Sequence, residues 1–265
     1  MPKVPRRFKF HFPLFPFLLL LITSILSYLN YQPGTTLSGW DNLHSEFNFA
    51  LDFKRALFSV WQEYRGLGLL SGMAPAADLP RILFLWFVNS YIPGFVASYL
   101  RYFYLFFSLS LGPVSVYYLF KNIFKKKFDK ETIEIASFLG GLYYLLNLAT
   151  VQYFFTPFET FHSFYAFLPL LLFIFLKTLQ RPSLPRYLLL YTCSLLSAPS
   201  FYVQTLFVVF ILTLIPFSIE HLISHKRKLK SLLSIVTSQL SILTSQLYWL
   251  LPAIFFALTG AKSVL

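Results

Sequence analysis

The residues best suited to chemistry lie directly after the first long apolar stretch, in the segment Gly-Trp-Asp-Asn-Leu-His-Ser-Glu. Its first acid, Asp41, can act as a general base that takes a proton from an attacking hydroxyl group. The same residue can cap a following helix, since Asp is among the best N-cap residues, and the two roles are compatible. Glu46 is a second candidate for acid–base work, with a solvated helix face as its alternative. His44 can bind phosphate or a metal ion, although this spacing fits no known metal motif.

Three arginines and a second polar segment complete the candidate set. Arg65, Arg81 and Arg101 carry planar guanidinium groups, which can grip a phosphate with two parallel hydrogen bonds. Their alternative role is to extend toward lipid headgroups. Glu159 and His162 lie between two apolar stretches, where an ionisable side chain at membrane depth is costly and therefore a functional candidate. That argument holds only if the segment is not fully exposed to water.

Composition indicates which elements must position these residues. The chain is 57% hydrophobic, 20% aromatic and only 12% charged, with a mean hydropathy of +0.64, which is outside the range of soluble globular domains. Its net charge of +12 excludes neither lipid nor nucleic acid until the basic residues are placed. Sixteen of the 22 Lys and Arg fall in four short clusters, at residues 3–9, 121–130, 177–186 and 226–230, each beside an apolar stretch. Cytoplasmic loops of membrane proteins have this pattern, so nucleic-acid binding is excluded.

The pattern predicts an all-α, multi-pass protein of the cell membrane with its N-terminus in the cytoplasm. About seven transmembrane helices satisfy both length and sidedness, at residues 12–29, 99–120, 133–155, 161–176, 187–198, 201–219 and 232–258. The fifth and sixth form a tight hairpin that turns near Pro199. The apolar stretch 82–96 is predicted to be re-entrant or interfacial, because Pro93 and Gly94 interrupt it and a crossing there would reverse the basic clusters.

The first outer segment, 30–81, is the longest one between the predicted spans. Apolar residues at helical spacing predict an amphipathic helix from Leu43 to about Arg65, lying flat at the membrane surface. The glycine-rich run 65–72 lacks the Lys and the Ser or Thr of a phosphate-binding loop, and so favours a turn.

No repeat or linker divides the chain, so residues 1–265 are predicted to form one unit. We expect this unit to be the N-terminal part of a longer membrane protein, because only a few residues follow the last span. On that expectation, polar residues of the last span such as Gln239, Ser241, Ser245 and Gln246 would pack against further helices. The alternative is that they pack within this unit.

The order of these features resembles the GT-C class of membrane glycosyltransferases, which have a first helix, a long outer segment that opens with an acid, and a stack of short-looped spans. The chain is most similar to the N-terminal region of the α-(1→3)-arabinofuranosyltransferases and to their YfhO-like relatives. The stretches that carry this resemblance are Gly39 to His44, Trp61 to Gly72, Arg101 to Tyr104, Gly112 with Pro113, and Leu247 to Pro252.

This resemblance implies transfer of a sugar from a polyprenyl-phosphate donor to an acceptor glycan on the outer membrane face, with inversion at the anomeric carbon. Asp41 matches the first-loop acid of the class and would deprotonate the acceptor hydroxyl. Many members have two adjacent acids, whereas Asn42 follows Asp41 here. A divalent cation is therefore an open question, with Glu46 or Glu159 as the second ligand. The alternative function is a non-catalytic membrane scaffold or a lipid-linked-sugar transporter of similar architecture.

Overall fold

The computed structural model describes residues 13–38, 44–58, 61–62, 69–70, 74–92, 94, 96–125 and 127–259. Its helices are α1 (Leu14–Asn30), α2 (Phe49–Phe58), α3 (Leu79–Tyr91), α4 (Ala97–Phe124), α5 (Lys130–Leu146), α6 (Leu148–Phe155), α7 (Glu159–Gln180), α8 (Leu184–Leu196), α9 (Gln204–Ser224) and α10 (Lys228–Thr259). Three 3-10 turns are η1 (Ser45–Phe47), η2 (Pro75–Asp78) and η3 (Ala198–Phe201). Two short strands, β1 (Trp61–Gln62) and β2 (Leu69–Leu70), pair antiparallel. The predicted helical class is confirmed.

Several of these helices are long and apolar enough to cross a membrane. Within the described residues they are α4, α7, α9 and α10, with a fifth span if α5 and α6 form one broken helix bent by 43°. The remaining two predicted spans coincide with shorter helices, α1 with 17 residues and α8 with 13. A helix needs about 20 residues to cross a bilayer. Membrane character is thus supported, while the number of seven spans stays a prediction.

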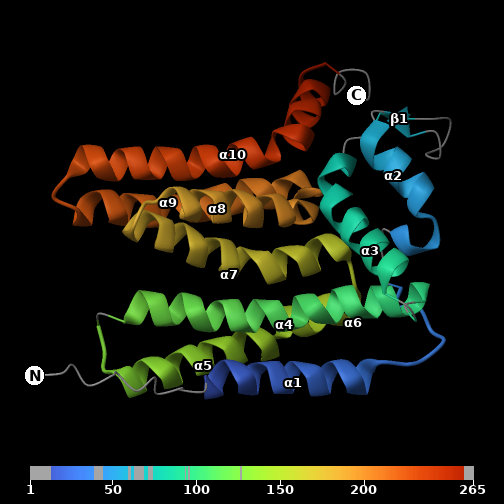
Figure 1. The fold of residues 1–265 in the computed structure, drawn as a ribbon, viewed down its shortest axis with the longest axis horizontal. Helices are drawn as coiled ribbons and strands as arrows, with labels where there is room; N and C mark the ends of the chain where they lie inside the picture. The colour runs from blue at the N-terminus through green and yellow to red at the C-terminus, as the bar shows by residue number, and fades with distance from the viewer. Residues whose placement is uncertain are drawn as a thin grey trace, which may run out of the picture.

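The long helices lie side by side along the longest axis of the molecule (Figure 1). The connections from α4 to α5, from α7 to α8 and from α9 to α10 gather at the left end in Figure 1. These connections contain Lys125, Lys127, Arg181 and Lys226, which belong to the predicted cytoplasmic clusters. The segment from η1 to α3 lies at the opposite end. Basic connections and the candidate site therefore occupy opposite ends of the bundle.

Small residues let α1, α4, α5 and α7 approach closely. A Cβ atom on Gly112 of α4 would lie 2.5 Å from Cε1 of Tyr165 on α7. One on Gly141 of α5 would lie 2.8 Å from Cδ1 of Leu19 on α1 and 2.9 Å from the carbonyl oxygen of Pro113 on α4. Helix association in lipid relies on such small-residue contacts, because lipid is as apolar as a leucine side chain. α4 consequently has a central place, in contact with α1, α5 and α7.

The amphipathic helix of the first outer segment is shorter than predicted. It begins at Phe49, where Oδ1 of Asn48 accepts a hydrogen bond from the backbone N–H of Leu51 at 3.0 Å, so Asn48 is its N-cap. It ends at Phe58, and Trp61 lies in β1 instead of on the helix. Strand pairing explains the early end, because Trp61 and Gln62 pair with Leu70 and Leu69, two residues within the glycine-rich run. Asp41, predicted as a cap, lies outside the described residues.

Two further predicted segments differ from expectation in their helix ends. The predicted span 133–155 is broken at Asn147, whose side chain caps α6 by accepting from the backbone N–H of Thr150 at 3.1 Å. The predicted outer loop around Glu159 is instead the first turn of α7, which places the carboxylate at the positive end of the helix dipole.

The other connecting segments agree with the sequence pattern. The helix expected within 82–96 is present as α3. Just beyond it, Gly94 has a φ of 91°, a left-handed backbone conformation that glycine adopts far more readily than other residues. The predicted hairpin turn near Pro199 is the 3-10 turn η3.

The polar residues of the last helix find partners inside the chain. Nε2 of Gln246 donates to the backbone oxygen of Ser194 on α8 at 2.7 Å, and its Oε1 accepts from Nε1 of Trp249 at 2.5 Å. Gln246 and Ser245 are both buried. These two residues therefore pack within this chain, as the second of the two alternatives predicts.

Candidate functional site

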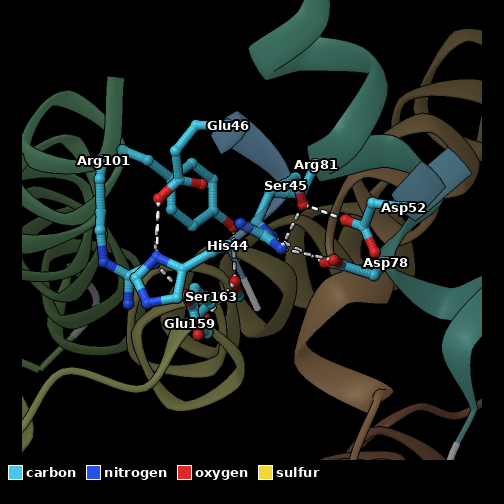
Figure 2. A network of polar contacts seen from close by, with 10 residues as sticks. His44, Ser45, Glu46, Asp52, Asp78, Arg81, Arg101, Glu159 and Ser163 are labelled. Atoms are coloured by element: carbon cyan, nitrogen blue, oxygen red, sulfur yellow. Dashed lines mark hydrogen bonds and ion pairs between the residues drawn. The ribbon is translucent and has the colours of Figure 1, made fainter. Parts of the chain in front are cut away.

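Charged residues that are distant in sequence meet at the end of the bundle opposite the basic connections. Glu46 comes from η1, Arg81 from α3, Arg101 from α4 and Glu159 from α7 (Figure 2). All four side chains are buried, with residue exposures between 1% and 7%. The sequence singled out each of them separately. In the structure Ser45, Asp52 and Asp78 surround Arg81, and Tyr104 with Ser163 connects this group to Arg101, Glu46 and Glu159.

Arg101 connects two acids that come from different parts of the chain. Its Nη1 forms an ion pair with Oε1 of Glu159 and lies 3.5 Å from Oε1 of Glu46. A buried carboxylate without a counter-charge would be very costly, so this guanidinium group allows both acids to remain inside the protein. Arg101 thereby fastens η1 to the start of α7.

Arg81 holds a second group of acids. Its Nε and Nη2 donate to the two carboxylate oxygens of Asp78, at 2.8 and 2.6 Å. Nη2 also donates to Oγ of Ser45 at 3.0 Å, and that hydroxyl donates to Oδ2 of Asp52 on α2. The bidentate geometry is the strongest form of an arginine–carboxylate contact. It positions η1, η2 and α2 around one guanidinium group.

A tyrosine on α4 connects the two halves of the network. The guanidinium carbon of Arg81 lies 5.7 Å from the ring centre of Tyr104. The hydroxyl groups of Tyr104 and Ser163 are 2.5 Å apart, and Ser163 in turn donates to the backbone oxygen of Glu159 at 2.7 Å. Both charged halves are therefore braced by α4 and α7, the two long helices at the centre of the fold.

His44 and Glu46 form a pair that borders open space. Nδ1 of His44 lies 3.1 Å from Oε1 of Glu46, and the His44 side chain is 26% exposed whereas that of Glu46 is 1% exposed. If Nδ1 carries the proton of this contact, Nε2 is left as a proton acceptor. Oε2 of Glu46 has no hydrogen-bond partner among the described residues. An imidazole oriented by a buried carboxylate is a common arrangement in acid–base catalysis.

A cavity of about 340 Å³ lies beside this pair. Its polar lining includes His44, Asn48, Asp52, Arg55 and Asp78, and its apolar lining includes Phe47, Leu51, Ile82 and Tyr202. Arg55 on α2 is half-buried, so a cation borders the cavity in addition to the acids. The volume is at the lower end of the range for small-molecule sites.

A second hollow, of about 370 Å³, lies between α1 and α4. Aromatic side chains dominate its lining, including Tyr31, Tyr99, Tyr102 and Phe103, with Ser27 among its polar members. The ring centres of Tyr31 and Tyr102 are 5.0 Å apart in an edge-to-face arrangement. The hollow has the chemical character that suits an apolar chain with a polar end.

Of the remaining predicted site residues, the structure describes only His162. His162 is fully buried on α7, where Nδ1 contacts the backbone oxygen of Phe158 at 2.7 Å and the ring packs on Phe154. Its Nε2 has no hydrogen-bond partner in the described part of the chain. Asp41 and Arg65 lie outside the described residues.

The open question of a metal ion receives no support from the described residues. Within them, no group of three or more His, Cys, Asp or Glu side chains is arranged to hold a metal. The nearest oxygens of Glu46 and Glu159 are instead occupied by Arg101. The guanidinium group of Arg101 therefore occupies the position between the two acids that a metal ion bound by both would need.

Burial raises the pKa of one acid of the network, Asp78, and this shift can be tested. Desolvation raises the pKa of Asp78 from 3.8 to about 6, against the opposing effect of Arg81 and with smaller additions from Asp52 and Glu159. The folded protein thus holds the Asp78 proton more tightly than the unfolded chain does. The stabilisation from this protonation is fully present below the unfolded value of 3.8 and is lost as the pH rises through about 6.

We therefore expect the Asp78→Asn variant to flatten the stability profile, because Asn cannot titrate. In the unmodified protein the unfolding temperature in detergent should fall between about pH 4 and about pH 6, and the variant should lose part of that fall. Thermal unfolding at a series of pH values measures the effect. Asp129→Asn, a change at an exposed N-cap at the other end of the bundle, is the control. Hydrogen bonds from Thr132 lower the pKa of Asp129, so its titration lies below this pH window and the control should keep the unmodified profile within the window. An identical slope in the Asp78 variant would contradict the assignment.

Sequence reasoning did not single out Ser45, Arg55, Tyr104 and Ser163. Ser45 and Ser163 stand directly beside candidates in the sequence, so their position was a usable signal. Arg55 and Tyr104 have no candidate as a direct neighbour. Only the packing of α4 on α7 brings the hydroxyl group of Tyr104 to that of Ser163.

Comparison with known proteins gives no relative, since the chain matches no protein-family model, no curated protein and no solved structure. Its function is therefore inferred from its own residues and their arrangement.

Proposed function

We propose that this protein is a membrane glycosyltransferase that moves a sugar from a polyprenyl-phosphate donor to an acceptor glycan. The observation that carries the proposal is the buried network in which Arg101 joins Glu46 to Glu159 beside a polar cavity. Ionisable groups buried near the ends of apolar helices are costly and are retained mainly where function needs them. The sequence resemblance to the GT-C class supplies the reaction.

In this reaction the acceptor hydroxyl oxygen attacks the anomeric carbon of the donor sugar. The bond from that carbon to the phosphate oxygen breaks, and the polyprenyl phosphate leaves with the electron pair. A base must take the hydroxyl proton, and we assign this role to Asp41, with Glu46 as the second catalytic acid. His44, oriented by Glu46, borders the cavity and can accept a hydrogen bond or proton there.

The leaving phosphate needs positive charge near the cavity. Arg55 lines it directly. Arg81 contacts Asp78, which also lines the cavity, and Arg101 contacts Glu46, the partner of His44. We infer that Arg81 and Arg101 contribute to donor binding mainly by fixing the positions of the acids and of His44. Arg65 remains a candidate for phosphate contact on sequence grounds. The aromatic hollow between α1 and α4 is suited to the first isoprene units of the donor.

The second reading of the same network is structural, in a scaffold or a lipid-linked-sugar transporter. Buried ion pairs can also specify packing, as Arg101 does between η1 and α7. A transporter would carry ionisable residues near the middle of its spans. The charged groups of the described network instead belong to η1, η2, α2, α3 and the first turns of α4 and α7, at one end of the bundle (Figure 1), which favours chemistry at a membrane surface.

A donor screen tests the proposal. The purified full chain in lipid nanodiscs is supplied with a panel of polyprenyl-phosphate sugars and a mixture of oligosaccharide acceptors. We expect release of polyprenyl phosphate together with an extended glycan for one donor class. Movement of an intact donor across a vesicle membrane without release would support the transporter reading. Neither release nor movement with any donor would support the scaffold reading and contradict the enzyme.

The proposed outer location of the site is tested by chemical labelling. With Cys193 replaced by Ser, single cysteines are introduced at Thr36, near the site, or at Ser183, in the connection between α7 and α8; both positions are exposed. We expect an impermeant thiol reagent added to intact cells to label position 36 and not position 183, because basic connections face the cytoplasm. The reverse pattern would place the candidate site in the cytoplasm and exclude an outer-face reaction.

A further inference from the structure

At the end of the bundle opposite the candidate site, a second pocket has the character of an anion site. It has a volume of about 410 Å³ and lies where the C-terminal ends of α4, α7 and α9 meet. Its cationic lining is Lys125, Lys127 and Arg181, together with the imidazole groups of His221 and His225. Glu220 is the one acid in this lining among the described residues.

The cations of this pocket are not neutralised by neighbouring acids. Within the described ranges no carboxylate is within ion-pair distance of Lys125, Lys127 or Arg181. Nζ of Lys125 contacts only neutral side chains, the amide oxygens of Asn122 at 3.3 Å and Gln180 at 3.1 Å. Like charges held around one hollow repel each other, so an anion in the hollow would be stabilised.

The helix dipoles oppose anion binding here, so their negative charge must be compared with the positive charge of the basic side chains. Each of the three helix C-termini carries about half a negative charge. Two further basic residues already contact such ends: Arg186 donates to the backbone oxygens of Lys177 and Arg181, and Lys228 donates to those of Leu222 and Ile223. With α7 and α9 capped in this way, the charges on Lys125, Lys127 and Arg181 exceed the remaining negative charge.

An unsatisfied donor in the lining independently points to a ligand. Asn122 is 5% exposed and lines the pocket, and its Nδ2 has no hydrogen-bond partner among the described residues. A buried amide N–H group without a partner is unfavourable, because it has given up its hydrogen bonds to water and gained none in return. A ligand oxygen in the pocket would accept this hydrogen bond. The pocket therefore suits an anion that has several acceptor oxygens. A phosphate group is such an anion.

We propose that this pocket binds a phosphate group, carried either by the headgroup of an anionic phospholipid or by a soluble phosphate compound. Apolar residues Ile123, Leu176 and Phe217 line the same pocket and can contact the glycerol or acyl part of a lipid. Basic pockets between membrane helices are established sites for anionic headgroups. The site is separate from the proposed glycosyltransferase site and does not depend on it.

Native mass spectrometry of the detergent-solubilised full chain tests the lipid source. Phosphatidylglycerol or phosphatidylcholine is added at equal concentration, and we expect preferential retention of phosphatidylglycerol. The pocket variant Lys125→Gln with Arg181→Gln should bind phosphatidylglycerol about tenfold or more weakly. Each basic residue near the membrane surface strengthens the binding of an anionic lipid several-fold, and the variant removes two of them. The matched control Lys130→Gln with Lys230→Gln removes the same charge from exposed positions at the same end and should bind normally.

A second arm tests the soluble source and guards against misfolding. Inorganic phosphate should raise the unfolding temperature of the unmodified chain and not that of the pocket variant if the ligand is soluble. The charge-retaining variant Lys125→Arg with Arg181→Lys should keep binding in whichever arm responds. A response in either arm supports the site. Equal loss in pocket and control variants, or no response to either phosphate source, would overturn it.

Discussion

Replacement of Arg101 by Leu is expected to destabilise the protein more than any other single change in the network. The variant would leave Glu46 and Glu159 buried without their shared counter-charge, at 7% and 1% exposure. Removing one partner of a buried ion pair typically costs about 3–5 kcal/mol. Denaturant unfolding of the protein in detergent micelles, followed by tryptophan fluorescence, measures the difference.

Arg227→Leu is the matched control for this change, since Arg227 is exposed at the opposite end of the bundle and should cost well under about 1 kcal/mol. A second variant, Arg101→Leu combined with Glu159→Gln, should recover part of the lost stability because the uncompensated charge is removed. If Arg101→Leu unfolds at the same denaturant concentration as the unmodified protein, the acids do not depend on this guanidinium group.

Replacement of Asp41 by Asn is expected to have the largest effect on activity. Asn cannot take the proton of the acceptor hydroxyl, and loss of a general base lowers rates by about 10²–10⁴-fold. The unfolding temperature should be unchanged, because the N-cap of α2 is Asn48. The rate of polyprenyl-phosphate release, measured with the donor identified in the screen, gives the effect.

Glu46→Gln separates the role of Asp41 from that of its neighbour. This change keeps the side-chain shape but weakens the contact with His44, so we expect a rate loss smaller than that of Asp41→Asn. Asp129→Asn, at the other end of the bundle, is the control for loss of one acidic charge and should retain full activity. Full activity in Asp41→Asn would remove Asp41 from the mechanism and leave His44 with Glu46 as the candidate base.

The helices of this fold were predictable because long apolar stretches leave a chain few alternatives in lipid. The positions of α4, α7, α9 and α10 follow directly from hydropathy. The ends of helices were predicted less well. Asn147 breaks one predicted span, and Asn48 starts α2 later than expected, because capping by a single polar side chain overrides the periodic pattern.

The candidate site was predictable in its residues but not in its contacts. Glu46, Arg101 and Glu159 stand out in the sequence because charges are rare beside apolar stretches. Their pairing depends on how α4 packs against α7, which the sequence pattern does not encode locally. The sequence predicts that Arg101 binds a substrate phosphate, whereas its contact with two carboxylates depends on three elements, η1, α4 and α7, meeting in the fold.

Photo-crosslinking with a donor analogue tests most directly whether the Glu46–Arg101–Glu159 end of the bundle is the active site. A polyprenyl phosphate with a photoreactive group next to the phosphate is activated in membranes that contain the full chain, and the labelled peptides are identified by mass spectrometry. The account predicts labelling within residues 44–58 and 74–82, around the cavity beside His44, and its loss when excess donor is added. Labelling confined to the basic ends of α4, α7 and α9, or labelling that donor does not displace, would contradict it.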